Sequence, residues 1–234
     1  MTDSIDESAD FRSSSWLTHQ WVAAGIVSSA SRFIPIPFVD DIVRGQCHRF
    51  VVARTLAHHN REDLLANLKP YYSPAGGCLS GCLGTIARAP LKLLFFPIRK
   101  VIAIVTSVRG VPLEITRTVL LGRTLERSLR EPNWDLTSEH AERMRHAFDT
   151  AFHRMDFRVA RAAMSDALSS ASGWKTAAIA SAKRIVDRPD EIPSEMVVES
   201  AVDDSAKNIE AVLERPEFLA LFDEFDRRFD EHFD

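Results

Sequence analysis

Helical spacing of apolar residues is the feature that most limits what this chain can fold into. A half-buried strand would show strict alternation of apolar and polar residues between two turns, and this pattern occurs nowhere in the sequence. The β-branched run at residues 101–106 is the best strand candidate, but it lies within a helical context. We therefore predict an all-α, multi-helix bundle whose core is built by helix packing alone.

Prolines and capping residues divide this pattern into helices. Pro35 and Pro37 end a first helix over about 14–31, because each proline forces the preceding residue out of the α region. A second helix begins near Pro37 or Asp40 and runs to about residue 59, followed by a short one at 60–69. The central segment 83–130 is predicted to form helical pieces kinked at prolines. Further helices are expected at about 138–155, 157–170, 174–187, 194–214 and 216–232.

The same pattern suggests a domain organisation. Residues 1–12 carry acidic side chains and no apolar period, so we expect a disordered acidic tail. Residues 13–130 would form an N-terminal helical domain that contains the apolar and basic centre. Residues 131–234 would form a C-terminal helical domain.

Charge is distributed very unevenly along the chain. The formal net charge is −4, which does not favour a generally basic nucleic-acid-binding protein. Segment 83–130, however, holds nine Lys or Arg against two acids, whereas residues 187–234 hold five against sixteen. Either each set is simply a solvated helix face, or the basic segment meets an anionic partner. Lipid head groups and the chain's own acidic C-terminal part are both such partners.

The composition of the basic segment favours lipid over nucleic acid. Large apolar side chains alternate there with cations, as they do in helices that lie at a membrane interface. Nucleic-acid binding would need more phosphate contacts and stacking aromatics, and adjacent phenylalanines cannot both stack from one helix face. The expected lipid-binding residues are Arg88, Lys92, Phe95, Phe96, Arg99, Lys100 and Arg109.

Residues 216–234 contain the clearest amphipathic helix of the sequence. Its aromatic stripe consists of Phe218, Phe222, Phe225 and Phe229, at positions i, i+4, i+7 and i+11. The stripe either packs on this protein's own bundle or inserts into the groove of a protein partner. The second possibility makes the chain a soluble helical adaptor. A third is that the acidic helix closes over the basic segment.

The sequence contains few motifs that are typical of catalytic or metal-binding sites. Phosphate-binding glycine loops, nucleophile elbows and the common zinc-protease motif are all missing, which favours a non-enzymatic role without excluding scattered catalytic residues. Gly-Cys-Leu repeats at a period of four around Cys78 and Cys82, where small residues allow close helix packing. With Cys47 and His48 these thiols could instead complete a metal site, so a metal protein or enzyme is a further alternative. We predict no cofactor.

Residues 33–41, Phe-Ile-Pro-Ile-Pro-Phe-Val-Asp-Asp, join two apolar helices. This corner resembles one in the membrane-associated helical region that follows the GTPase domain of some bacterial small GTPases, and in similar stand-alone bacterial proteins. The resemblance covers about residues 22–60, and because the P-loop is missing it implies no nucleotide chemistry. It implies a bacterial, membrane-proximal helical protein in which residues 78–108 correspond to an apolar helical hairpin.

Taken together, these features predict a peripheral membrane-associated scaffold. The charge-free stretch 13–31 contains too many serines for a transmembrane helix, and cations interrupt the apolar centre. An odd number of cysteines, three, argues for a reducing compartment. We therefore expect a cytoplasmic protein, peripheral at the inner face of the membrane.

Overall fold

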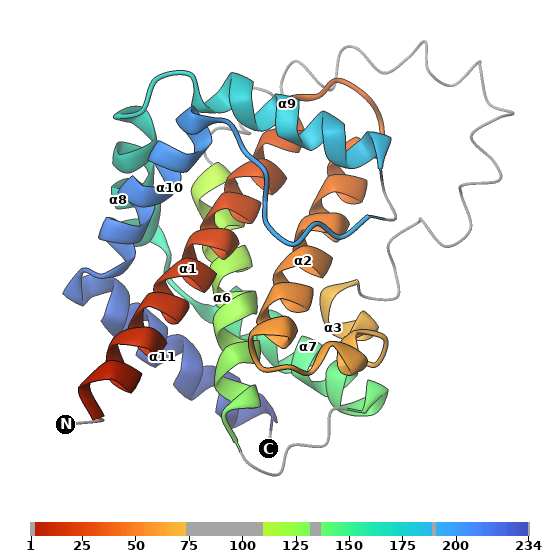
Figure 1. Ribbon diagram of the computed structural model, residues 1–234, viewed down its shortest axis with the longest axis vertical. Helices are drawn as coiled ribbons and strands as arrows, with labels where there is room; N and C mark the ends of the chain where they lie inside the picture. The colour runs from red at the N-terminus through yellow and green to blue at the C-terminus, as the bar shows by residue number, and fades with distance from the viewer. Residues whose placement is uncertain (1–2, 74–109, 132–136, 189–190, 234) are drawn as a thin grey trace, which may run out of the picture.

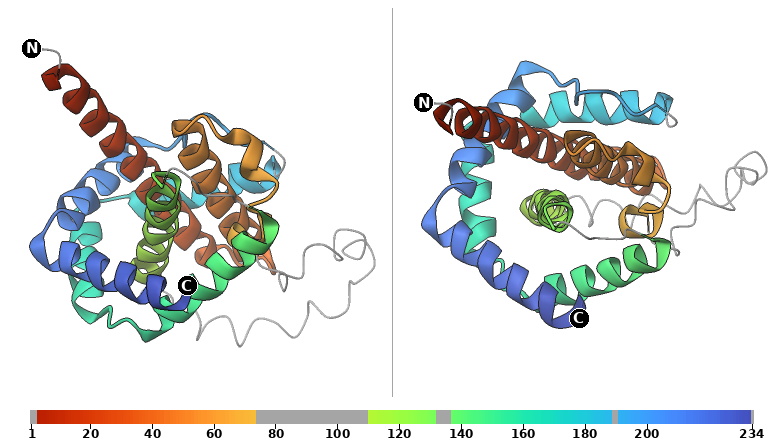
Figure 2. Two further views of the ribbon diagram at one scale, coloured as in Figure 1. Left: turned by 90° about the horizontal axis from the view of Figure 1, so that it is seen from below. Right: turned by 60° about the horizontal axis from the view of Figure 1, so that its bottom comes forward.

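The chain folds into helices that surround one central helix (Figures 1 and 2). The computed structural model describes residues 3–73, 110–131, 137–188 and 191–233, with side chains from residue 15 onward. Within these ranges there is no β-strand, so the predicted all-α bundle is confirmed. The elements are α1 (Asp3–Ala30), η1 (Ser31–Phe33), α2 (Val39–His58), η2 (Glu62–Leu65), α3 (Lys69–Tyr72), α6 (Val111–Leu129), α7 (Ser138–Arg154), α8 (Arg158–Ser169), α9 (Trp174–Asp187), α10 (Ser200–Leu213) and α11 (Pro216–Phe233).

Helix α6 is the central element. Fourteen of its 19 residues are buried, including polar ones at positions 114, 116, 118, 124, 126 and 128. Seen nearly end-on in Figure 2 (right), it is surrounded by α1 and α2 on one side and by α7, α10 and α11 on the others. Pro112 lies in its first turn, where the missing N–H has no helical partner to lose. Pro112 therefore begins a helix and does not kink one.

The crossing of α1 and α6 depends on glycine. A Cβ atom at Gly25 would lie 2.9 Å from the Cα of Ile115. At Gly122 it would lie 2.4 Å from the indole ring of Trp21, which donates a 3.1 Å hydrogen bond to Thr55 on α2. The two glycines therefore allow α1 and α6 to approach more closely than any larger residue would permit.

Several predicted boundaries are confirmed within a residue or two. Helix α2 begins at Val39, directly after the two prolines, with Asp40 and Asp41 in its first turn. Helix α9 has the predicted bounds, and α11 extends one residue further than expected. Helix α7 is capped by Thr137, whose hydroxyl accepts a hydrogen bond from the backbone N–H of His140.

Three expectations differ from the structure. The single short helix expected at 60–69 is replaced by the 3-10 helix η2 and, after a turn, by α3. Helix α1 begins at Asp3, so residues 3–12 continue the helix where we expected a disordered tail. Helix α10 begins at Ser200, whereas a start at 194 was expected. Residues 194–199 instead form hydrogen bonds to other helices. The backbone N–H of Met196 donates a 2.7 Å hydrogen bond to the side chain of Gln20 on α1. The side chain of Arg54 on α2 donates a 3.2 Å hydrogen bond to the carbonyl of Ser194.

One hydrophobic core crosses the domain boundary expected at residue 130. Buried residues of α1, α2 and α6 belong to the same cluster as those of α7, α8, α9, α10 and α11. Residues of α1 also pack directly on α9 and α10. The two halves of the described chain therefore do not form separate cores.

Candidate functional site

The predicted aromatic stripe is buried on the inner face of α11. Phe218, Phe222, Phe225 and Phe229 are between 0 and 6% exposed. The ring of Phe225 packs edge-on against Phe148 of α7, with 5.3 Å between ring centroids. In this conformation the stripe thus contacts the protein's own helices, which is the intramolecular alternative considered from the sequence. A partner protein would have to displace α11 to reach it.

Helix α11 also pairs its acidic side chains with the arginines of α6. Arg123 donates a 2.8 Å hydrogen bond to Asp226, and Arg127 makes two hydrogen bonds to Asp230, one of them 2.9 Å long. The same guanidinium groups lie over aromatic rings, Arg123 at 5.1 Å from the centroid of Phe222 and Arg127 at 5.6 Å from that of Phe229. Part of the basic segment is therefore already covered by acidic α11.

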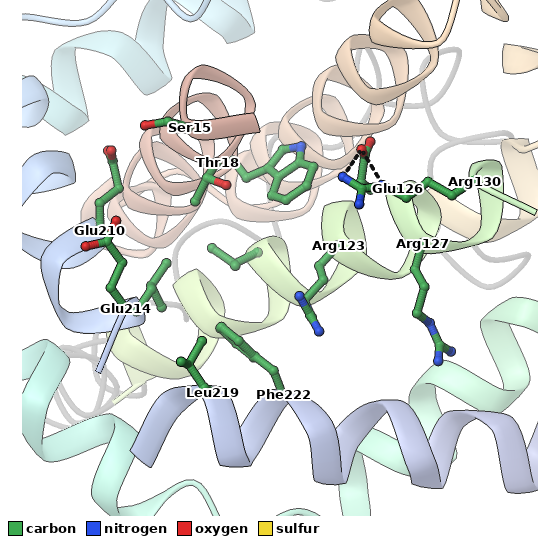
Figure 3. A pocket seen from close by; sticks show the side chains of 13 residues that line it. Ser15, Thr18, Arg123, Glu126, Arg127, Arg130, Glu210, Glu214, Leu219 and Phe222 are labelled. Carbon is green, nitrogen blue, oxygen red and sulfur yellow. Dashed lines mark hydrogen bonds and ion pairs between the residues drawn. The ribbon is translucent and has the colours of Figure 1, made fainter. Parts of the chain in front are cut away.

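A pocket of about 390 Å³ lies beside this interface, between α1, α6, α10 and α11 (Figure 3). Its walls are largely apolar and include Trp21, Leu219 and Phe222. Figure 3 shows arginines of α6 at one end and the carboxylates of Glu210 and Glu214 at the other. The pocket can therefore offer both charges, at opposite ends, to a small amphipathic molecule.

The carboxylate of Glu210 is held by a histidine of α1. Nδ1 of His19 lies 2.5 Å from Glu210, and its Nε2 lies 3.0 Å from Asp203, also on α10. The hydrogen bond to Glu210 raises the pKa of His19 above its ordinary value, against the opposing effect of burial, and the negative charges of both carboxylates add to the increase. His19 therefore joins α1 to two carboxylates of α10.

A second ionic cluster is buried between α1, α2 and α6. Glu114, 5% exposed, accepts hydrogen bonds of 2.8 Å from Ser28, 3.1 Å from Arg32 and 3.1 Å from Arg44. Burial opposes its ionisation, but the positive charges of Arg44 and Arg32 and the hydrogen bond from Ser28 together keep its pKa below the ordinary value. This carboxylate is thus a structural anion that fixes three helices.

Cys47 and His48, from the metal alternative, lie next to this cluster and are fully buried. Burial raises the pKa of the Cys47 thiol far above its ordinary range and lowers the pKa of His48 to about 4. Burial therefore favours the protonated thiol, which is a poor nucleophile. Cys78 and Cys82, the other half of that alternative, lie outside the described residues.

The lipid-binding residues predicted from the sequence also lie outside the described part of the chain. Arg88, Lys92, Phe95, Phe96, Arg99, Lys100 and Arg109 all fall between residues 74 and 109. Among the described residues, no helix combines the length and the apolar character needed to cross a membrane.

The sequence raised the closing of acidic α11 over the basic segment as one alternative, but it did not identify which arginines of α6 pair with which carboxylates. A signal was present: Arg123 and Arg127 are four residues apart, as are Asp226 and Asp230, so both pairs repeat once per helical turn. Comparison with protein-family models, with curated proteins and with solved structures finds no match.

Proposed function

We propose that this protein is a peripheral membrane-associated scaffold, in which the helical body carries the basic and apolar segment 83–109 to an anionic lipid surface. Large apolar side chains of this segment, such as Phe95 and Phe96, would enter the interface. The cations beside them would meet the head groups. The helical body would then present its outer faces to the cytoplasm.

The distribution of ion pairs carries this proposal. Four of the nine cations of segment 83–130 lie on α6 or directly after its last residue, and each is paired with a carboxylate: Arg117 with Asp149, Arg123 with Asp226, Arg127 with Asp230, and Arg130 with Glu126. The remaining five lie at residues 83–109, a stretch that contains no Asp or Glu. The excess positive charge of the chain is therefore concentrated next to its most apolar residues.

Co-sedimentation with lipid vesicles tests the proposal. We expect the purified protein to bind vesicles that contain an anionic phospholipid, to bind neutral vesicles weakly, and to lose binding as salt increases. Each cation near an anionic surface contributes about 1 kcal/mol, so Arg99→Gln with Lys100→Gln should lower the partition coefficient by roughly 30-fold.

A matched control variant shows whether weaker vesicle binding comes from losing charge in segment 83–109 or from lowering the net positive charge anywhere on the protein. Arg158→Gln with Lys183→Gln removes the same charge from exposed positions on α8 and α9 and should bind like the parent. Equal weakening by both double variants, or failure to bind anionic vesicles at low salt, would refute the membrane role. Binding to a protein partner that persists at high salt would favour the adaptor alternative instead.

A further inference from the structure

Two histidines and a glutamate meet where the C-terminal end of α2 reaches α6. His58 is the last residue of α2, His59 follows it, and Glu126 lies in the penultimate turn of α6. Nε2 of His59 is 2.8 Å from Glu126 Oε2. One ligand atom from each of the three residues lies within 4.8 Å of the other two. None of these three residues lies in the segment 83–109 that is proposed to meet lipid.

We propose that His58, His59 and Glu126 form a binding site for a divalent transition metal of the zinc type. Two imidazoles and one carboxylate are a ligand set that zinc accepts, with a fourth position left for water or an exogenous ligand. Around a tetrahedral zinc the ligand atoms would lie about 3.3 Å apart. Zinc binding would require the three atoms, now within 4.8 Å of one another, to reach that distance by side-chain rotation.

The surroundings of Glu126 support a built site. Its second oxygen, Oε1, accepts hydrogen bonds of 3.3 and 3.1 Å from Arg130, which leaves Oε2 directed toward His59. Ligating carboxylates are commonly fixed in this way by a neighbouring donor. The Glu126 side chain is 11% exposed and that of His59 22%, and His58 is half-buried. A metal bound here would therefore replace a histidine–carboxylate hydrogen bond that is already in place.

The ligand set also selects the kind of metal. Calcium and magnesium prefer several oxygen ligands, whereas this trio offers one carboxylate whose charge is shared with Arg130. Imidazole nitrogens favour zinc and its neighbours in the transition series. Glu126 and Arg130 also line the pocket of Figure 3, so a metal at this point would lie at the edge of a space that can admit a small ligand.

Zinc titration of the full-length chain by isothermal calorimetry tests the site. The parent for this test carries Cys78→Ser and Cys82→Ser, because those thiols could bind zinc themselves. We expect one zinc ion per chain and a rise in melting temperature on zinc addition. His58→Ala with His59→Ala should weaken binding by at least about tenfold and abolish that rise.

The control removes two histidines from elsewhere. His146→Ala with His153→Ala changes exposed positions on α7 and should leave the affinity unchanged. If the His58/His59 variant does not fold by circular dichroism, His59→Gln and Glu126→Gln supply the comparison, and each should weaken binding. The proposal is overturned if the parent binds no zinc, if the site variants bind as tightly as the parent, or if the control loses as much affinity as they do.

Discussion

Replacing Gly122 with alanine should destabilise the fold, although the same change normally strengthens a helix. Gly122 lies in the interior of α6, where alanine is intrinsically favoured by about 0.8–1 kcal/mol. Against this gain, the new Cβ would lie 2.4 Å from Cε2, 2.5 Å from Cδ2 and 2.6 Å from Nε1 of Trp21. The ring cannot easily yield, because its N–H is hydrogen-bonded to Thr55 and only 5% of the residue is exposed.

The expected loss follows from these distances. Ordinary contact begins at 3.4 Å, so the ring or the helix must move by about 1 Å. Overpacking of this kind costs about 1–3 kcal/mol, and the rigid ring places Gly122→Ala toward the upper end. After the gain in helix propensity, we expect a net loss of about 1–2 kcal/mol. In a chain of this size that lowers the melting temperature by about 2–8 °C.

Urea denaturation followed by tryptophan fluorescence and circular dichroism measures the change. Gly45→Ala is the matched control, because it lies inside α2 and a Cβ there meets no atom within 4 Å. That variant should be stabilised by about 0.5–1 kcal/mol. The two substitutions are chemically identical, so the opposite sign isolates the contact with Trp21.

A double variant provides the refutation. In a Trp21→Leu background the obstacle is gone, and Gly122→Ala should be neutral or stabilising, with a coupling energy of at least about 1 kcal/mol. If Gly122→Ala alone stabilises the protein, or if its cost is the same with Leu at position 21, the close packing of α1 against α6 is not what requires glycine.

Three further predictions concern the ionic clusters. Glu114→Gln should cost about 2–4 kcal/mol in urea denaturation, because it removes the buried carboxylate that Arg32 and Arg44 share and leaves Arg44 only the exposed carboxylate of Asp41. A loss below about 0.5 kcal/mol would contradict the structural role. His19 has a raised pKa when folded, so its contribution is complete below about pH 6.5 and is lost as pH rises through the folded pKa. The stability difference between the parent and His19→Gln should therefore shrink as the pH rises above about 6.5, and a difference that grows would reverse the assignment. Asp226→Asn with Asp230→Asn should loosen α11 from α6 and increase sedimentation with anionic vesicles. The control is Asp223→Asn with Glu217→Gln, which changes two exposed positions on the same helix. Unchanged binding of the first variant relative to this control would show that α11 does not mask the basic segment.

Local signals in the sequence were sufficient for most helices. The prolines at 35 and 37 fixed the end of α1 and the start of α2, and the phenylalanine spacing defined α11 with its buried face. These features act within a few residues of one another. The burial of α11 was one of the alternatives that its amphipathic pattern allowed.

Long-range pairing was not accessible in the same way. His59 and Glu126 are 67 residues apart, and Arg123 and Asp226 are 103 apart, so nothing in either local pattern specifies the partner. The start of α10 was misplaced for the same reason, since the backbone of Met196 is bound to Gln20, 176 residues earlier. Residues of the stretch 194–199 make these long-range hydrogen bonds in the folded chain, and they do not form the helix that their local sequence predicted.

The central position of α6 affects how the chain can fold while it is being synthesised. Residues 216–233 close the ring around α6, so a nascent chain that has not yet reached them exposes both its arginines and its apolar face. Such an intermediate combines the charge and the apolar surface that attract chaperones and membranes. Because α11 is the last helix of the described chain, α6 can acquire its complete set of neighbours only after residues 216–233 have been made.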